Sequence, residues 1–183
     1  MAPRKKRRVF MGLCAFVYTI CMCYLLFLRR LTTGKAVSMR RYAEQHGYRK
    51  AVRNFINLKP LQTIKHFYRS WRSDYNRNGF NLWNYAFVNN AGNVLIFIPL
   101  GFILPYFWKA QRNPLVFLFT TTLLICGVEV TQVALLVGRC DVDDLILNTI
   151  GCVIGYGFYC IYHLIFRRHR HDKSGSKHRT GEI

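Results

Sequence analysis

The sequence predicts an all-α protein, a polytopic integral membrane bundle of four transmembrane helices, and three observations lead to that class. Hydrophobic residues make up 51% of the 183 residues, yet the formal net charge is +19. The 27 Lys and Arg are segregated, because they fall before residue 9, between residues 29 and 77, in short connections and after Phe166. Four apolar stretches remain, each of the roughly 20 residues that cross a bilayer core. A soluble nucleic-acid-binding protein spreads its basic residues over a folded surface, so we expect no nucleic-acid partner.

The chain begins with a basic segment, residues 1–8, which we expect in the cytoplasm, followed by the first predicted span, residues 9–28. This span contains no charged residue, and Arg29 and Arg30 follow it directly. The apolar core of a signal peptide is shorter and ends at a small-residue cleavage site. We therefore expect residues 9–28 to remain in the membrane as an anchor.

The connection after the first span, residues 29–85, is long and strongly basic. It contains an amphipathic patch in which Ala51, Val52, Phe55 and Ile56 are interspersed with Arg and Lys. Such a patch is compatible with a segment that lies on anionic lipid. A solvated loop with ordinary surface charge explains the same pattern, and the sequence alone does not decide between the two.

The remaining spans form a predicted three-helix core, residues 86–166, in which the only charged residue outside the connections is Glu129. Its helices are residues 86–108, 114–138 and 145–166. A basic tail, residues 167–183, follows. Four spans put both termini on one side of the cell membrane. Because the positive-inside rule counts mainly short loops, discounting the long 29–85 connection predicts cytoplasmic termini and an external connection.

Glu129 is the outstanding polar residue of the spans, since an ionisable group in hydrocarbon is costly and faces a bundle interior or a cavity. Gln132 follows three positions later and therefore shares its helix face. At about 1.5 Å per residue, Glu129 lies near the middle of the membrane. The simplest explanation is an interhelical hydrogen-bonding pair, with the carboxyl protonated, that stabilises the bundle.

A charged connection follows this helix at the predicted membrane edge, where Arg139 stands among Asp141, Asp143 and Asp144. We expect Arg139 to turn inward, where its guanidinium can hold a phosphate or carboxylate in bidentate geometry. The alternative is an exposed salt bridge with these carboxylates, which contributes about 0–1 kcal/mol and is dispensable. Asp144 shares a helix face with Asn148, whereas Asp143 is turned about 100° away and is expected to matter least. The order of acids is similar to a calcium loop but lacks the closing Glu and the length.

Further polar and small residues lie on the second and fourth spans. Pro99 frees the carbonyl of Leu95, which must find a partner inside the protein. With the predicted topology, the polar residues meet in one pocket that opens toward the outer leaflet. Its members are Asn93, Glu129, Gln132, Arg139, Asp141, Asp144 and Asn148. The residues expected to shape helix packing are Pro99, Gly101, Gly151 and Gly155.

The cysteine and histidine patterns predict no metal site, no cofactor and no disulfide framework. Of the seven cysteines only Cys140 lies outside an apolar stretch, and the sequence has no CxxC pair or Cys/His metal spacing. It also shows no Ser/His or Cys/His pairing of the kind that activates a nucleophile. These absences favour a binding or structural role over catalysis.

Four segments occur in a fixed order along the chain. They are residues 57–64 (NLKPLQTI), 89–101 (NNAGNVLIFIPLG), 129–132 (EVTQ) and 139–155 (RCDVDDLILNTIGCVIG). In order and spacing they resemble the VanZ-like family of membrane proteins, with Lys59 and Leu61 as departures. The resemblance covers about residues 57–157.

The resemblance implies a bacterial cytoplasmic-membrane protein, and the family's namesake confers resistance to the glycopeptide teicoplanin. We therefore expect the pocket and the basic connection to bind an anionic lipid, a lipid-linked wall precursor or the glycopeptide at the outer leaflet. Two alternatives remain. One is a membrane enzyme acting on a lipid head group, with Glu129 or Asp144 as acid/base and Arg139 as anion clamp. The other is a non-catalytic scaffold subunit that contacts partners through its glycine face.

Overall fold

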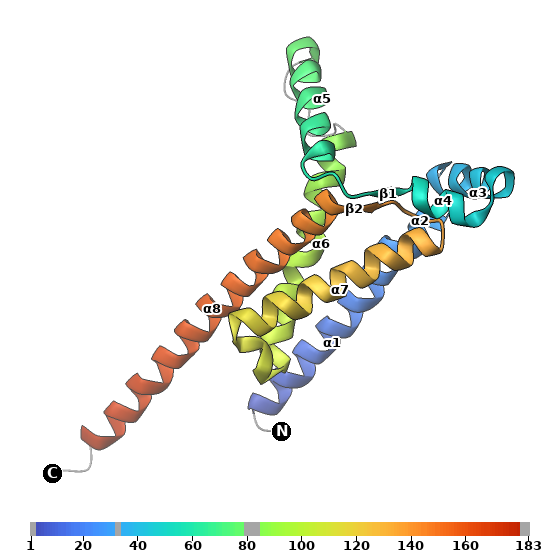
Figure 1. Cartoon of the computed structure of the whole chain (residues 1–183). Coiled ribbons are helices and arrows are strands. Elements are labelled where there is room, and N and C mark those ends of the chain that lie inside the picture. Colours follow the sequence, from blue (N-terminus) through green and yellow to red (C-terminus); the bar gives the residue numbers. More distant parts are fainter. Residues whose placement is uncertain (1–2, 32–33, 79–84, 180–183) are drawn as a thin grey trace.

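Four helices in the structure are long and apolar enough to cross a membrane, which confirms the all-α class and the multi-pass architecture. They are Lys5–Leu31, Asn90–Phe107, Pro114–Ala134 and Val142–Phe166. The computed structural model describes residues 3–31, 34–78 and 85–179. Figure 1 shows the start of the first span and the end of the last one at the same end of the bundle, as four spans require.

The first span contains an unusual turn. It consists of α1 (Pro3–Cys23), a π-helical segment η1 (Tyr24–Leu28) and α2 (Arg29–Leu31). In η1 the N–H of Arg29 bonds the carbonyl of Tyr24, five residues back. Single π-helical turns inside α-helices are rare and often mark functional sites.

The second and third spans are joined by a short, well-capped connection. The second is α6 (Tyr85–Phe107), and a 3₁₀ turn, η2 (Lys109–Arg112), leads to α7 (Pro114–Ala134). Asn113 precedes α7, and its side chain accepts hydrogen bonds from the N–H groups of the first turn. Pro114 then occupies the first helical position, where it removes no helical hydrogen bond.

The third helix ends earlier than its hydropathy predicts. Leu136 takes a left-handed φ of 54°, and the N–H groups of Val137 and Gly138 return to the carbonyl of Gln132. This arrangement closes a helix in the manner of a Schellman turn. The last span, α8 (Val142–Arg179), begins three residues before its predicted start, so Asp143 and Asp144 belong to its first turn.

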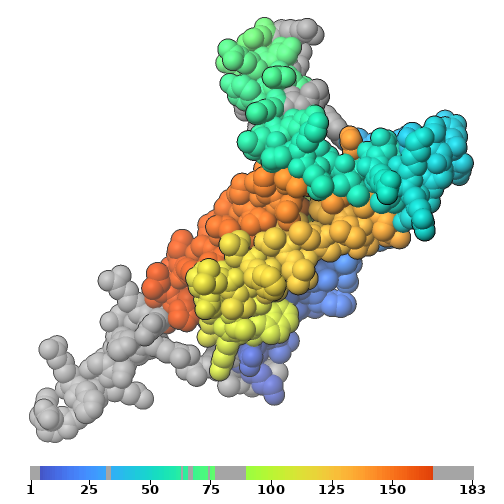
Figure 2. Space-filling model, viewed as in Figure 1, coloured from blue at the N-terminus to red at the C-terminus, as the bar shows by residue number. Residues whose placement is uncertain are grey.

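The 29–85 connection is folded rather than an open loop. It contains α3 (Gly34–His46), α4 (Tyr48–Asn54), a short strand β1 (Ile56–Asn57) and α5 (Gln62–Asn78). Figure 2 shows these elements over the end of the bundle opposite the start of α1.

The amphipathic patch of this connection packs against the protein itself. Ala51 is fully buried in a small cluster with Met39 and Leu136, and Val52 and Phe55 pack on it. The two predicted alternatives, a lipid-facing patch and a solvated loop, are therefore both wrong for most of its apolar side chains. Its basic residues remain on the outside, because Arg49, Lys50 and Arg53 are exposed.

A two-stranded parallel sheet joins this folded connection to the turn between the last two spans. Ile56 pairs with Cys140 and Asn57 with Asp141 across β1 and β2 (Cys140–Asp141). The N–H of Cys140 also bonds the carbonyl of Phe55 at 3.1 Å. The sheet is a small departure from an all-α fold, and it fixes the acidic turn beside the end of the bundle.

The helices α6 and α8 are in direct backbone contact. A Cβ at Gly101 would overlap the carbonyl of Cys152, and one at Gly151 or Gly155 would overlap a carbonyl of α6. Only glycine permits this approach. Gly151 and Gly155 lie one turn apart on α8 and Gly101 faces them from α6, so the three glycines set the close approach of the two helices.

The proline-containing part of α6 has a partner in the first span. Pro99 and Pro105 lie inside α6, and the Tyr18 hydroxyl donates to the carbonyl of Ile96 at 2.7 Å. The acceptor is the carbonyl next to that of Leu95, so a partner for the Leu95 carbonyl itself stays a prediction. The first span therefore packs on the core as a structural member.

Candidate functional site

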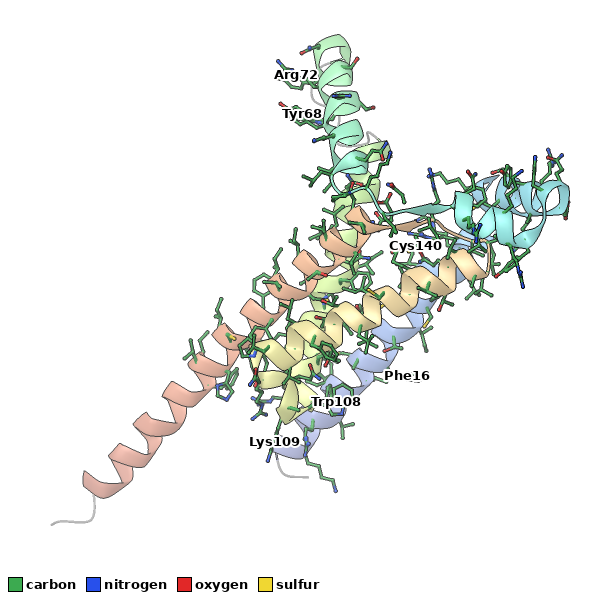
Figure 3. The ribbon with its side chains drawn as sticks, viewed as in Figure 1. Phe16, Tyr68, Arg72, Trp108, Lys109 and Cys140 are labelled. Carbon is green, nitrogen blue, oxygen red and sulfur yellow. The ribbon has the colours of Figure 1, made fainter. Side chains whose placement is uncertain are left out.

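Polar side chains from all four spans gather at the end of the bundle that carries the sheet. Figure 3 shows Cys140 at this end, whereas Trp108 and Lys109 lie at the opposite end. We call the following residues the charged cluster: Arg30, Asn93, Glu129, Gln132, Asp141, Asp144 and Asn148.

One hydrogen bond joins α6 to α8 within the cluster. The amide nitrogen of Asn93 donates to Asp144 Oδ1 at 2.8 Å. Asn93 is buried, while Asp144 is half-buried at the rim. Because the bond uses a charged acceptor, it is stronger than an ordinary amide–carbonyl bond.

Gln132 joins the first span to α7. Its amide nitrogen donates to the carbonyl of Leu26 at 3.1 Å, inside the π-helical turn. Its amide oxygen accepts from Arg30 Nη1 at 2.9 Å. Gly138 leaves the room for this arrangement, since a Cβ there would lie 2.8 Å from Arg30 Nη1 and 3.0 Å from Gln132 Oε1.

Glu129 lies one turn deeper, with 4% of its surface exposed. Its Oε2 accepts from the backbone N–H of Asp141 at 3.4 Å. The carboxyl groups of Glu129 and Asp144 interact electrostatically with each other, and both interact with the Arg30 guanidinium. The Arg30 guanidinium therefore interacts with carboxyl groups of two different helices, which lowers the cost of ionising them.

Arg139 was predicted to turn inward and to supply the cation of the pocket, and the structure contradicts this position. Arg139 is exposed, whereas the guanidinium that enters the cluster comes from Arg30. From the sequence, Arg29 and Arg30 are expected to be flanking charges, because positive residues beside a span are common. The one available signal was indirect, namely three carboxylates at 141–144 with only one nearby cation in the sequence.

Asp143 is also misplaced by the sequence argument, which expected it to be the least important acid. It is fully buried. Its carboxylate accepts from the N–H of Leu61 at 2.5 Å and from the N–H of Ile64 at 3.1 Å. It thus fixes the start of α5, where Leu61 has a left-handed φ of 61°. The side of α8 that carries Asp143, about 100° from the side that carries Asp144, meets the start of α5 rather than water.

Asp141 organises the start of α8. Its Oδ1 accepts from the N–H of Asp143 at 3.0 Å, as an N-cap side chain does. Its Oδ2 accepts from the Asn57 amide at 3.3 Å. Since these contacts hold the acidic turn in place, Asp141 positions the cluster as well as adding charge to it.

Asn148 has an unusual position. It is 3% exposed, and its Oδ1 accepts no hydrogen bond in the structure. On α8 it lies one turn after Asp144 and three residues before Gly151, which touches Val94 of α6. Asn148 therefore lies in the α6–α8 interface, directly below the Asn93–Asp144 bond. A buried acceptor without a partner is costly and calls for an explanation.

The cluster does not have the makeup of a metal centre or of an activated nucleophile. Within the described residues, no group of three or more His, Cys, Asp and Glu side chains is placed to hold a metal ion. Burial, and then the negative charge of Glu129, raise the pKa of the Cys140 thiol. A thiol with a raised pKa is less nucleophilic at neutral pH.

Comparison with known proteins identifies a family to which this chain is similar. The chain matches the VanZ/LLP1 family over residues 15–166. No curated protein and no solved structure matches. The match extends further than the sequence motifs at 57–157, and it includes Tyr18, Leu26 and Arg30 of the first span. Because it covers most of the chain, from the span that supplies Arg30 to the end of the apolar part of α8, this multi-pass membrane protein belongs to the VanZ/LLP1 family.

Proposed function

We propose that this chain is a bacterial cell-envelope protein that binds a polar head group at the outer leaflet through the charged cluster. The head group belongs to a membrane lipid, a lipid-linked wall precursor or a glycopeptide. Binding reduces susceptibility to teicoplanin-type antibiotics. The proposal takes the resistance phenotype from the family's namesake, and its placement of the binding site from the charged cluster.

The observation that carries the binding site is the burial of ionisable groups at the end of an apolar bundle. Arg30, Glu129 and Asp144 come from three different spans and interact with one another. Bringing such groups into a membrane protein costs several kcal/mol unless they serve each other or a ligand. Hydrogen bonds within the protein account for the burial of Gln132 and Asp143. Asn148 Oδ1, in contrast, is buried and accepts no hydrogen bond.

The proposed sidedness follows from the distribution of charge. The start of α1 and the end of the last span lie at the end of the bundle that carries Lys109 of η2. The folded 29–85 connection and the charged cluster lie at the other end. Discounting the long connection, as the positive-inside rule does, places the termini in the cytoplasm and the cluster at the outer leaflet.

Reporter fusions after Arg72 and after Ser174 test the sidedness. We expect the fusion after Arg72 to be external and the one after Ser174 to be cytoplasmic. The reverse pattern would place the charged cluster at the inner leaflet, where it could not meet an extracellular glycopeptide.

The function itself is tested by expressing the chain in a susceptible Gram-positive host that lacks it and measuring teicoplanin susceptibility. The intact chain should raise the inhibitory concentration several-fold. Arg30→Met should abolish the increase at unchanged membrane level, because it removes the cation shared by Glu129 and Asp144. Arg139→Lys is the matched control and should retain it, because Arg139 is exposed. Equal loss in both variants would disconnect the cluster from resistance.

Head-group chemistry is a second candidate, favoured by the two carboxyl groups of Glu129 and Asp144 facing each other across α7 and α8. Such a pair can divide the roles of acid and base. Glu129→Gln separates the two functions, since Gln keeps an acceptor and a donor but transfers no proton. Retained resistance in this variant supports binding, and complete loss at normal membrane level supports chemistry.

A further inference from the structure

We infer that α5 binds the anionic lipid surface of the membrane that its own chain spans, with an aromatic face among the head groups. The inference goes beyond the proposed function, because it concerns a helix outside the charged cluster and needs only the multi-pass architecture. Three observations carry it: the aromatic face of α5, the basic side chains beside that face, and the attachment of the start of α5 to the last span.

The first observation is a row of aromatic side chains along one face of α5. Tyr68, Trp71 and Tyr75 lie at helical spacing. The ring centroids of Tyr68 and Trp71 are 6.4 Å apart, and the rings of Trp71 and Tyr75 are stacked at 5.7 Å. About half of the surface of Tyr68 and of Tyr75 is exposed. Tyr and Trp have an apolar body and a polar tip, and both are enriched where a membrane meets water.

The second observation is the placement of basic side chains beside this face. At about 100° per residue, Lys65 and Arg72 lie on the flank next to Tyr68, with Arg69 further round. All three basic side chains are exposed. Figure 3 shows Tyr68 and Arg72 on the same side of α5, away from α3 and α4. Ser73 occupies the opposite side by its position in the helix. An apolar face with Lys and Arg beside it is typical of a helix that lies in a membrane interface.

The third observation is that the start of α5 is held at the edge of the last span. The Asp143 carboxylate accepts from the N–H groups of Leu61 and Ile64. Asp143 belongs to the first turn of α8, and the apolar span begins one residue earlier, at Val142. The segment that leads into α5 also exposes apolar side chains at this level, since Leu58 is 70% exposed and Leu61 46%. These leucines are thus placed where head groups meet acyl chains.

The membrane surface is the occupant that these features fit. A bilayer surrounds the four spans, so it lies beside the base of α5 without any second protein. The basic side chains complement an anionic leaflet, and each Lys or Arg near such a surface strengthens binding about fivefold. A partner protein could also cover an aromatic face, and the experiment below separates this outcome from lipid contact.

Tryptophan fluorescence in the full chain tests the inference. The sequence contains three tryptophans, so Trp83→Phe and Trp108→Phe together leave Trp71 as the reporter. The protein is reconstituted into vesicles of phosphatidylglycerol and phosphatidylcholine whose acyl chains carry bromine near the head group. Bromine quenches a tryptophan that touches lipid, and acrylamide quenches one that is open to water. We expect strong quenching of Trp71 by brominated lipid and weak quenching by acrylamide.

A matched variant moves the reporter to the other side of the same helix. In the same background, Trp71→Phe with Ser73→Trp places the tryptophan two residues along, about 200° around α5. Ser73 is exposed, so a larger side chain meets no packed neighbour there. Brominated lipid should quench this tryptophan weakly, and acrylamide should quench it strongly.

The contribution of charge is tested in the Trp71 reporter. Lys65→Gln and Arg72→Gln should each shift the equilibrium between bound and free α5 about fivefold toward the free form. Vesicles of phosphatidylcholine alone should release α5 further. Arg49→Gln is the control, because Arg49 is an exposed basic residue of α4. It should leave the quenching unchanged.

Four results would overturn the inference. Strong quenching of Trp71 by acrylamide, with weak quenching by lipid, would place the aromatic face in water. Weak quenching by both would show that protein covers it, as in a dimer of this chain. Equal lipid quenching of Trp71 and of the Ser73→Trp reporter would deny α5 a lipid-facing side. Lipid quenching that does not change with charge would remove the anionic surface as its ligand. None of these readouts depends on teicoplanin susceptibility, so the inference and the proposed resistance role are refuted by different results.

Discussion

Gln132→Leu should separate the first span from the rest of the bundle at its charged end. Gln132 is fully buried. Its amide satisfies the carbonyl of Leu26 in the π-helical turn, and its oxygen accepts from Arg30. Leu has a similar volume, so packing is largely kept. The variant therefore tests the hydrogen bonds rather than a cavity.

The size of the effect follows from the two groups left behind. A buried polar group that loses its partner costs about 1–3 kcal/mol, although interhelical hydrogen bonds in membranes average only about 0.6 kcal/mol. The Leu26 carbonyl lies in a π-helical turn, and Arg30 carries a full charge. We therefore expect about 2 kcal/mol in total, which for a chain of this length lowers Tm by about 4–8 °C.

Thermal unfolding of the purified protein in mild detergent measures this change, with a fluorescent fusion to follow the folded fraction on a sizing column. Gln111→Leu is the matched control, because the Gln111 side chain bonds Thr120 of the adjoining helix α7, at 3.1 Å, and no residue of the first span. It should change Tm by less than half as much. A Gln132→Leu protein as stable as the wild type would refute the argument that this side chain holds the first span to α7.

Three further predictions concern other contacts. Asp143→Ala should speed tryptic cleavage within α5 several-fold over the wild type, because the Asp143 carboxylate holds the start of that helix. Asp143→Asn should be cleaved at a rate between those of Asp143→Ala and the wild type. Equal rates in all three proteins would contradict this role. Gly155→Leu should destabilise the bundle by about 1–3 kcal/mol or more, since its side chain would overlap the backbone of α6, while Gly157→Leu, which meets open space, should be neutral in the same thermal assay. Tyr18→Phe should cost about 1 kcal/mol by removing the donor to Ile96, and an unchanged Tm would show that this hydrogen bond does not hold the first span to α6.

The spans, and the burial of most of their polar residues, could be predicted because both depend on the local sequence. An apolar run of about 20 residues has few alternatives in water or lipid. Polar groups inside such a run are costly, so Asn93, Glu129 and Gln132 were expected to turn inward, and the structure buries all three. Helical spacing likewise placed Gly151 and Gly155 on the face that packs against α6.

Other features could not be predicted, because they depend on contacts between distant segments. Leu136 ends α7 by its backbone conformation, although the apolar sequence continues to Val137. Asn57 and Asp141 pair across 84 residues, and no local pattern indicates such a pairing. Periodicity correctly gave the direction of Asp143 relative to Asp144, but it could not reveal that α5 lies in that direction.

Arg30 illustrates the same limit and shows why the first span is more than an anchor. A π-helical turn adds one residue to the helix, which rotates everything after it by about 100°. Without η1, the side chain of Arg30 would project in another direction and would not meet Gln132. The carbonyl of Leu26, within that turn, is the group that Gln132 satisfies. The π-helical turn and the inward position of the Arg30 charge therefore depend on each other. The family match, which begins at residue 15, includes both. A span that only held the protein in the membrane would need neither.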